Sequence, residues 1–241
     1  REPKHLAAEG SKVLKTFDRV LANPPFSLKN WGDETWSKGD KFGRDTYGCP
    51  PKSYGDLAFV QHMIASLNPT GKLGVVLPHG ILFRGGAEAK IRQGILKDDL
   101  IEAVIGLAPN LFYGTGIPAC VLIINKNKEA ARQGKVLFVN GTEEMVEGKN
   151  QNTLSEANVT RLAKAFLAFN DEERFARVVG LDEIAKNDFN LNIARYVQTN
   201  EEEELIDVAE EVRVLKDLME ARDKAEAKML EFLEELGYTT E

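Results

Sequence analysis

The chain has 241 residues, of which 43% are hydrophobic and 29% are charged, and its formal net charge is −7 at pH 7. These fractions are typical of a soluble globular protein, and no apolar run is long enough to span a bilayer. Cys49 and Cys120 lie far apart, and the three histidines (His5, His62 and His79) form no cluster. We therefore expect a cytoplasmic protein with free thiols, without membrane association and without a metal site.

The negative charge is concentrated at the C-terminal end. Residues 201–241 contain 15 acidic and five basic side chains, a net charge of −10, so the first 200 residues carry +3. A block of like charge is typical of an interaction segment. We expect the mildly basic body to tolerate a DNA backbone and the acidic end to avoid one.

The first predicted element is a short apolar strand, Val20–Ala22, after a polar stretch without periodicity. Such a run indicates a buried parallel strand of an α/β sheet. Asn23, Pro24, Pro25 and Phe26 follow directly, and prolines end a strand because they cannot donate to its hydrogen-bond ladder. The sequence therefore predicts a rigid turn at the carboxyl end of a strand, where open α/β sheets bind their ligands.

The residue types in this turn suit a flat heterocycle that carries an exocyclic amino group. The side-chain oxygen of Asn23 and the carbonyl of Pro24 can each accept one proton of that group, which directs the nitrogen lone pair at an electrophile. Phe26 offers a face on which an extruded base can stack. A simple proline turn with Phe26 in the core is the alternative. We predict Asn23, Pro24, Pro25 and Phe26 as the catalytic residues, because this turn resembles the motif of amino-group DNA methyltransferases.

Residues 27–53 form a long segment without periodicity, and we expect a loop beside the site. It mixes aromatic and basic side chains of the types that hold bases and phosphates, namely Trp31, Trp36, Lys38, Lys41, Arg44 and Tyr47. A surface lid with scattered charges explains the same composition equally well.

The remaining pattern alternates helices and strands. Helices are expected over 55–67, 87–97, 154–169 with Ser155 as N-cap, and 181–185, and a turn over 68–71. Strands are expected over 73–77, 100–107, 119–124 and 135–140. This order predicts an α/β fold whose parallel sheet ends in an antiparallel hairpin. We divide the chain into a catalytic part (1–150), a small helical or linker region (151–199) and a C-terminal helix (200–241).

Five segments, taken in order, resemble the modification subunit of type I restriction-modification systems. They are the Asn-Pro-Pro-Phe stretch, YGDLAFVQHM (54–63), VLPHGILFRGG (76–86), NLFYGTGIP (110–118) and NDFNLNIARYV (187–197). Ala194 departs from the family's proline, which concerns the stiffness of the linker and leaves the chemistry unaffected.

The resemblance implies a partial Rossmann-like methyltransferase sheet that transfers methyl from S-adenosylmethionine to the N6 of a flipped adenine. It assigns a second apolar contact with the base to Phe112, or to Tyr113 in reserve, although a core aromatic is an equally good interpretation of Phe112. The Gly-rich cofactor motif has no counterpart, since Gly114-Thr115-Gly116 is followed by Ile117-Pro118 where a helix should begin. We therefore expect a C-terminal portion that is inactive alone, and its cofactor-binding residues stay unknown.

The longest periodic run, 201–236, predicts one amphipathic helix with an acidic outer face. Its apolar residues recur every three or four positions: Leu205, Val208, Val212, Leu215, Leu218, Ala221, Ala225, Met229, Phe232 and Leu236. The helix can pack on its own domain, but its length favours a partner. The resemblance implies docking on the specificity subunit, with DNA, the restriction subunit and a second modification subunit as further partners.

Two rival functions remain open at this point. The chain can belong to a methyltransferase that acts on RNA or on a protein glutamine, although that group usually has tyrosine where Phe26 stands. It can also be a non-catalytic fragment that only binds a partner.

Overall fold

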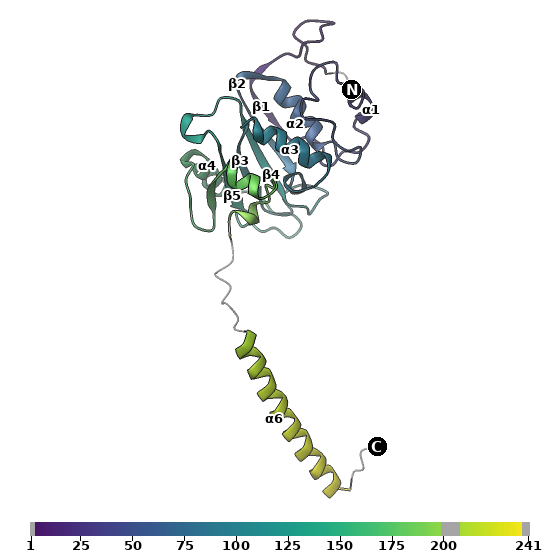
Figure 1. Cartoon of the computed structure of the whole chain (residues 1–241), viewed down its shortest axis with the longest axis vertical. Helices are drawn as coiled ribbons and strands as arrows, with labels where there is room; N and C mark the ends of the chain where they lie inside the picture. Colours follow the sequence, from purple (N-terminus) through teal and green to yellow (C-terminus); the bar gives the residue numbers. More distant parts are fainter. Residues whose placement is uncertain (1–2, 199–207, 238–241) are drawn as a thin grey trace. The chain divides into compact units, whose positions relative to one another are not determined.

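The computed structural model describes residues 3–198 and 208–237. The chain divides into two compact units, Arg1–Thr199 and Asn200–Glu241. The first unit contains the sheet and its covering helices, and the second contains the long helix α6 (Val208–Glu235) (Figure 1). Each unit is described by itself below.

The described residues of the first unit contain one six-stranded mixed sheet. Its strands are β1 (Phe17–Ala22), β2 (Leu67–Pro78), β3 (Ile101–Leu107), β4 (Ala119–Asn125), β5 (Lys135–Gly141) and β6 (Ala176–Gly180), in the order β1-β2-β4-β3-β5-β6. The pairs β1–β2 and β3–β5 are parallel and the other three are antiparallel. The predicted α/β fold is confirmed, and β3 and β4 form the expected antiparallel hairpin, but this hairpin lies inside the sheet and not at its end.

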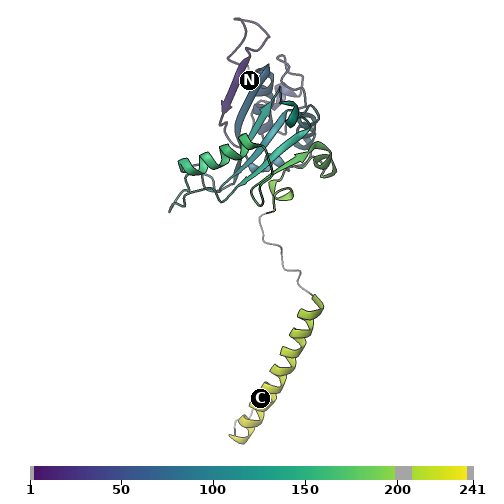
Figure 2. The same ribbon diagram turned by 90° about the vertical axis from the view of Figure 1, so that its left-hand side faces the viewer.

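Helices cover both faces of this sheet (Figures 1 and 2). Side chains from α2 (Asp56–Ala65), α3 (Ala87–Lys97) and α5 (Leu181–Lys186) share one core cluster with the inward side chains of β2 and β4. On the opposite face, α4 (Glu156–Ala168) packs on β3 and β5. Ser155 caps α4 as predicted, in a capping box with Asn158. The short helix α1 (Asp33–Trp36) lies outside these layers, in the loop after β1.

The prediction that β1 is a buried strand is wrong for Leu21, whose side chain is 87% exposed. Among the described strands β1 has β2 as its one neighbour, so it forms an edge of the sheet. Leu21 points to the α4 face beside Gly74 of β2, which offers it no side chain. Val20 and Ala22 point the other way and pack against the α2 and α3 cluster.

The expected turn over 68–71 is also wrong, because these residues belong to β2. The register between β1 and β2 jumps from Phe17–Leu67 to Arg19–Lys72 and skips the four residues. The turn-forming residues therefore make a bulge within the strand.

Two further segments complete the comparison with the predicted elements. Strand β6 was not predicted, and it places part of residues 151–199 in the sheet of the first unit. The predicted C-terminal helix is confirmed over Val208–Glu235, whereas residues 201–207 lie outside the described residues. Within the described ranges, no helix has both the length and the apolarity needed to cross a membrane.

Candidate functional site

The Asn-Pro-Pro-Phe turn begins directly after β1, whose last residue, Ala22, pairs with Val75 of the parallel strand β2. The turn therefore lies at the carboxyl end of two parallel strands, as predicted. Asn23 and Pro25 are exposed, and Pro24 and Phe26 are half-buried. The amide of Asn23 is thus presented to solvent on a backbone that its prolines hold stiff.

Phe26 and Phe112 meet in space although they lie far apart in the sequence. Their ring centroids are 5.5 Å apart with an interplanar angle of 64°, and both rings lie against the core cluster on the α4 face. Edge contacts of this kind position aromatic rings relative to each other. Tyr113 is 93% exposed, and the ring that meets Phe26 of the turn is that of Phe112.

The loop that carries Phe112 is held by a polar segment that the sequence analysis did not select. Asn110 and Gly114 adopt left-handed backbone conformations, with φ of 56° and 74°. The Gln151 side chain donates to the Leu111 carbonyl at 2.8 Å, and the Asn152 amide donates to the Pro109 carbonyl at 3.0 Å. A cavity of about 290 Å³ lies in this loop, lined by Asn110, Phe112, Tyr113, Gly114, Asn150 and Gln151 among others.

A buried carboxylate anchors the other end of the turn. Asp56, the first residue of α2, is fully buried, and its Oδ1 accepts a 2.7 Å hydrogen bond from the backbone N–H of Ser27. Ser27 has a positive φ of 50°, a conformation that needs support from its surroundings. Arg84 donates to Asp56 Oδ2 at 2.9 Å and to Glu88 at 2.7 Å. This network ties the residue after Phe26 to the start of α2 and to the loop before α3.

The charge state of this network is set by its partners. Burial lowers the pKa of Arg84, but Glu88 and Asp56 outweigh that effect, so its pKa lies above the usual range. The guanidinium also lies over the Tyr54 ring, 4.2 Å from the ring centroid. The sequence alone does not single out Asp56, because an acid in the first turn of a helix is common on electrostatic grounds alone.

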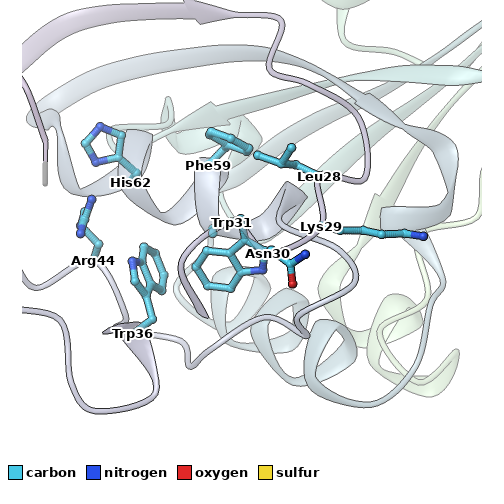
Figure 3. Close-up of a pocket in the computed structure, with 9 residues that line it drawn as sticks. Leu28, Lys29, Asn30, Trp31, Trp36, Arg44, Phe59 and His62 are labelled. Carbon is cyan, nitrogen blue, oxygen red and sulfur yellow. The ribbon is translucent and has the colours of Figure 1, made fainter. Parts of the chain in front are cut away.

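The loop after the turn folds around an aromatic pocket, which Figure 3 shows. We use "aromatic pocket" for a cavity of about 240 Å³ lined mainly by Leu28, Trp31, Trp36, Arg44, Phe59 and His62. Trp31 and Trp36 meet edge to face with centroids 5.2 Å apart. The indole N–H of Trp31 donates to the Pro51 carbonyl at 3.0 Å, which closes the loop on itself.

The basic and aromatic residues selected in this loop have different surroundings. Trp31, Trp36 and Arg44 line the aromatic pocket, whereas Lys38 and Lys41 are exposed and do not line it. Tyr47 instead donates its hydroxyl to Asp98 at 2.7 Å, and burial together with that carboxylate raises its pKa.

Within this loop, Arg44 forms an ion pair with Asp40. Its guanidinium donates to both carboxylate oxygens, at 3.0 and 2.5 Å, and lies 5.3 Å from the centroid of Trp36. Burial raises the pKa of Asp40, but the hydrogen bonds from Arg44 outweigh it, so the pKa is lowered overall. Across the pocket, burial, followed by the charge of Arg44, lowers the pKa of His62.

The described residues contain no metal-ligand cluster, and their G-x-G sequence is not a Gly-rich phosphate-binding turn that leads into a helix. No group of three or more His, Cys, Asp or Glu side chains among them is placed to hold a metal ion. Gly114-Thr115-Gly116 lies between β3 and β4, and no helix follows it that can receive an anion. Burial raises the pKa of Cys120 to about 12 and raises the pKa of Cys49, so neither thiol is a ready nucleophile.

The chain is similar to a family of known proteins along most of its length. The model of the family described as N-6 DNA methylase matches residues 2–205. A type I restriction enzyme MjaVIII methylase subunit from Methanocaldococcus jannaschii is 42% identical over 198 residues, which cover 80% of this chain and 34% of that protein. The HindI methylase subunit from Haemophilus influenzae is 32% identical and covers 94% of this chain and 53% of that protein.

A solved structure supports the same similarity. The type I restriction-modification methyltransferase subunit from Streptococcus thermophilus is 38% identical, with a TM-score of 0.71, and the match covers 77% of this chain and 39% of that one. The chain thus spans about a third to a half of the length of the relatives that it matches.

Proposed function

We propose that this chain methylates the N6 amino group of adenine in DNA. The chain belongs to the N-6 DNA methylase family and, within it, to the type I restriction-modification methylase subunits. One observation carries the proposal. An exposed asparagine amide stands at the carboxyl end of β1, and two aromatic rings from separate segments, Phe26 and Phe112, lie together beside it.

Asn23 and Pro24 perform the electronic part of the reaction in this proposal. The N6 amino group of adenine has two N–H bonds. In this proposal the Asn23 Oδ1 accepts a hydrogen bond from one of them, and the Pro24 carbonyl accepts a hydrogen bond from the other. The nitrogen lone pair is then drawn out of conjugation with the ring and directed at the incoming methyl group. Because these acceptors are preorganised on a stiff turn, they stabilise the developing positive charge without reorganising at the moment of transfer.

Phe26 and Phe112 hold the base in this proposal. A base inside a duplex cannot reach the turn, so the adenine must leave the stack at a cost of a few kcal/mol. Stacking on an aromatic side chain returns about 1–3 kcal/mol per base, which offsets most of that cost. The network of Asp56 and Arg84 keeps the turn in place behind the base through Ser27.

S-adenosylmethionine is the methyl donor that we propose, and it supplies a methyl group activated by a sulfonium. We assign none of its contacts to the described residues, because the one G-x-G sequence among them, Gly114-Thr115-Gly116, leads into strand β4 and not into a helix. We accordingly propose that this chain alone neither binds the donor tightly nor turns over.

The helix α6 is the proposed docking element for the specificity subunit. Within its own unit it exposes large apolar side chains on one side, including Leu215, Leu218, Met229 and Phe232. A surface of this kind is typical of an interaction site. DNA, the restriction subunit and a second modification subunit complete the proposed assembly, which we expect to work in the cytoplasm.

The proposal is tested by substrate choice. The full-length protein in its assembly should methylate an adenine-containing DNA duplex, and the same assay should give no product with an RNA of equal sequence or with a glutamine-containing peptide. The chain alone should show no turnover, and calorimetric titration should detect no low-micromolar donor binding. Methylation of RNA or of glutamine in preference to DNA would overturn the assignment.

A further inference from the structure

We propose that the aromatic pocket is a second base-binding site, which takes an unstacked nucleobase of the strand that carries the target adenine. This inference rests on the proposed function, because it requires that the neighbouring turn handles DNA. The pocket begins at Leu28, two residues after Phe26, and its second wall comes from α2. A strand that delivers one base to the turn therefore comes close to a wall of the pocket.

The shape and lining of the pocket suit a flat ring. Trp31, Trp36 and Phe59 present aromatic groups to one cavity, with Leu28 beside Phe59 (Figure 3). Its volume of about 240 Å³ is sufficient for a single nucleobase and too small for a folded partner. Stacking on such rings depends little on base identity, since every base has a π-face.

His62 supplies the polar contact that a base requires. Its Nδ1 is buried and has no hydrogen-bond partner among the described residues. A buried polar atom without a partner is costly, and it indicates a place where a ligand or a water completes the network. Burial and the charge of Arg44 lower the pKa of His62, so the imidazole is neutral at neutral pH and can donate or accept. The edges of all four bases offer groups of both kinds.

The combination of aromatic walls and nearby cations favours a nucleic-acid strand over an acidic peptide. The guanidinium of Arg44 is fixed by Asp40, so it lines the pocket as an oriented planar cation suited to stacking. Lys29 is exposed and extends away from the aromatic side chains in Figure 3, where it can contact a phosphate. An acidic peptide would satisfy the cations but would leave the aromatic walls without a ring to stack.

The chain contains an internal probe for this site, because Trp31 and Trp36 are the two tryptophans of its sequence and both line the pocket. Intrinsic tryptophan fluorescence of this chain therefore reports on the aromatic pocket directly. We would titrate the chain with a mixed-sequence single-stranded oligodeoxynucleotide and with a matched oligonucleotide of the same length whose sites are all abasic. The two probes carry the same backbone charge and differ only in their bases.

We expect saturable quenching by the oligonucleotide that has bases. The abasic oligonucleotide should need an at least about tenfold higher concentration for half-maximal quenching, since stacking contributes about 1–3 kcal/mol per base. Equal quenching by both probes would show that only the backbone binds near the loop. Absence of quenching would show that the pocket takes no base. Either result overturns the proposal.

Two variants separate this site from the target-base site. His62→Ala loses a hydrogen bond and should raise the oligonucleotide concentration for half-maximal quenching several-fold. His62→Gln keeps a polar side chain and should recover part of the lost affinity. Phe112→Ala should leave the quenching unchanged while it abolishes methylation by the full-length assembly. If Phe112→Ala removes the quenching and His62→Ala does not, the base lies at the turn and the pocket proposal is wrong. If the chain shows base-dependent quenching but the full-length assembly does not methylate adenine, base binding by the pocket stands and the proposed function falls.

Discussion

The two units of the molecule treat the same kind of apolar pattern in opposite ways. In the sheet unit, Leu73 and Leu77 of β2 are 1% and 0% exposed. In α6, Leu215, Leu218 and Phe232 recur at helical spacing but are 56%, 63% and 52% exposed. The first pattern is satisfied within its own unit, and the second is not satisfied within the helix itself. Because helices in proteins are stabilised mainly by packing of their apolar face, we expect another surface to cover the second pattern.

The difference separates chemistry from assembly. The residues that we propose for the reaction lie on the sheet unit, so changes there should leave partner binding intact. Residues on the α6 stripe should affect assembly and leave the sheet unit folded. Each prediction below tests one side of this separation.

The largest effect is expected for Asn23→Ala in the full-length assembled protein. Methyl transfer should fall by roughly two to three orders of magnitude, the loss found when a preorganised acceptor or donor is removed from a transition state. Donor affinity and subunit content should change little. Asn23→Asp keeps one acceptor oxygen and should be milder. Single-turnover methylation of hemimethylated DNA measures the effect, and near-normal turnover by Asn23→Ala would contradict the catalytic role.

A second large effect is expected from charging the α6 stripe. Burial of each leucine contributes about 1.5–3 kcal/mol, so Leu215→Glu combined with Leu218→Glu should abolish co-purification with the specificity subunit. Lys216→Glu changes the net charge by the same amount and leaves the apolar stripe intact, so it should co-purify normally. Circular dichroism should show an unchanged sheet unit. If the double variant bound the specificity subunit with unaltered affinity, the helix would not be the docking element.

An intermediate effect is expected at the anchor of the turn. Asp56→Ala leaves Arg84 and Ser27 without their buried acceptor and should lower the free energy of unfolding by about 3 kcal/mol. Asp56→Asn keeps one acceptor oxygen for Ser27 and should lose less. Glu183→Ala breaks the half-exposed pair with Arg177 and should cost at most about 1 kcal/mol. Urea unfolding of the three variants measures these differences, and equal losses for Asp56→Ala and Glu183→Ala would contradict the anchor.

The smallest effect is a pH dependence of stability from His62. Its folded pKa is lowered by burial, so the folded state resists a proton that the unfolded chain accepts below about pH 6.5. The stabilising contribution is therefore present above that pH and is lost as the pH falls towards the folded pKa. Urea midpoints should decrease between about pH 7.5 and pH 5, and His62→Gln should flatten that slope. An identical slope in the variant would exclude His62 as the source.

Local patterns in the sequence predicted most of the elements, because apolar runs, prolines and caps act locally. The strand before Pro24 and the cap at Ser155 are examples. The position of β4 between β2 and β3 depends on pairing between distant segments, which periodicity does not encode. Leu21 was misjudged for a related reason, since a three-residue apolar run predicts burial whether or not a neighbouring strand exists.

The candidate site also contains a part that was predictable from local sequence and a part that was not. The turn was predictable because its chemistry lies in consecutive residues, and Phe112 was selected from the family resemblance. The Asp56–Arg84 anchor and the His62 pocket were not predicted, because each joins residues from a loop and a helix whose approach depends on the tertiary fold. An aspartate at the start of a helix and a histidine within it look ordinary until their partners are known.

The central position of β4 has a consequence for synthesis on the ribosome. Strands β2 and β3 leave the ribosome first, yet each pairs with β4 along an inner edge. Until Asn125 has emerged, those edges and the apolar side chains of β3 have no partner and must be kept from aggregating. The loop with Phe112 joins β3 to β4, so the aromatic pair forms only when β4 inserts between β2 and β3. A nascent chain that stops before Ala119 therefore contains the Asn-Pro-Pro-Phe turn but cannot close the sheet that positions it.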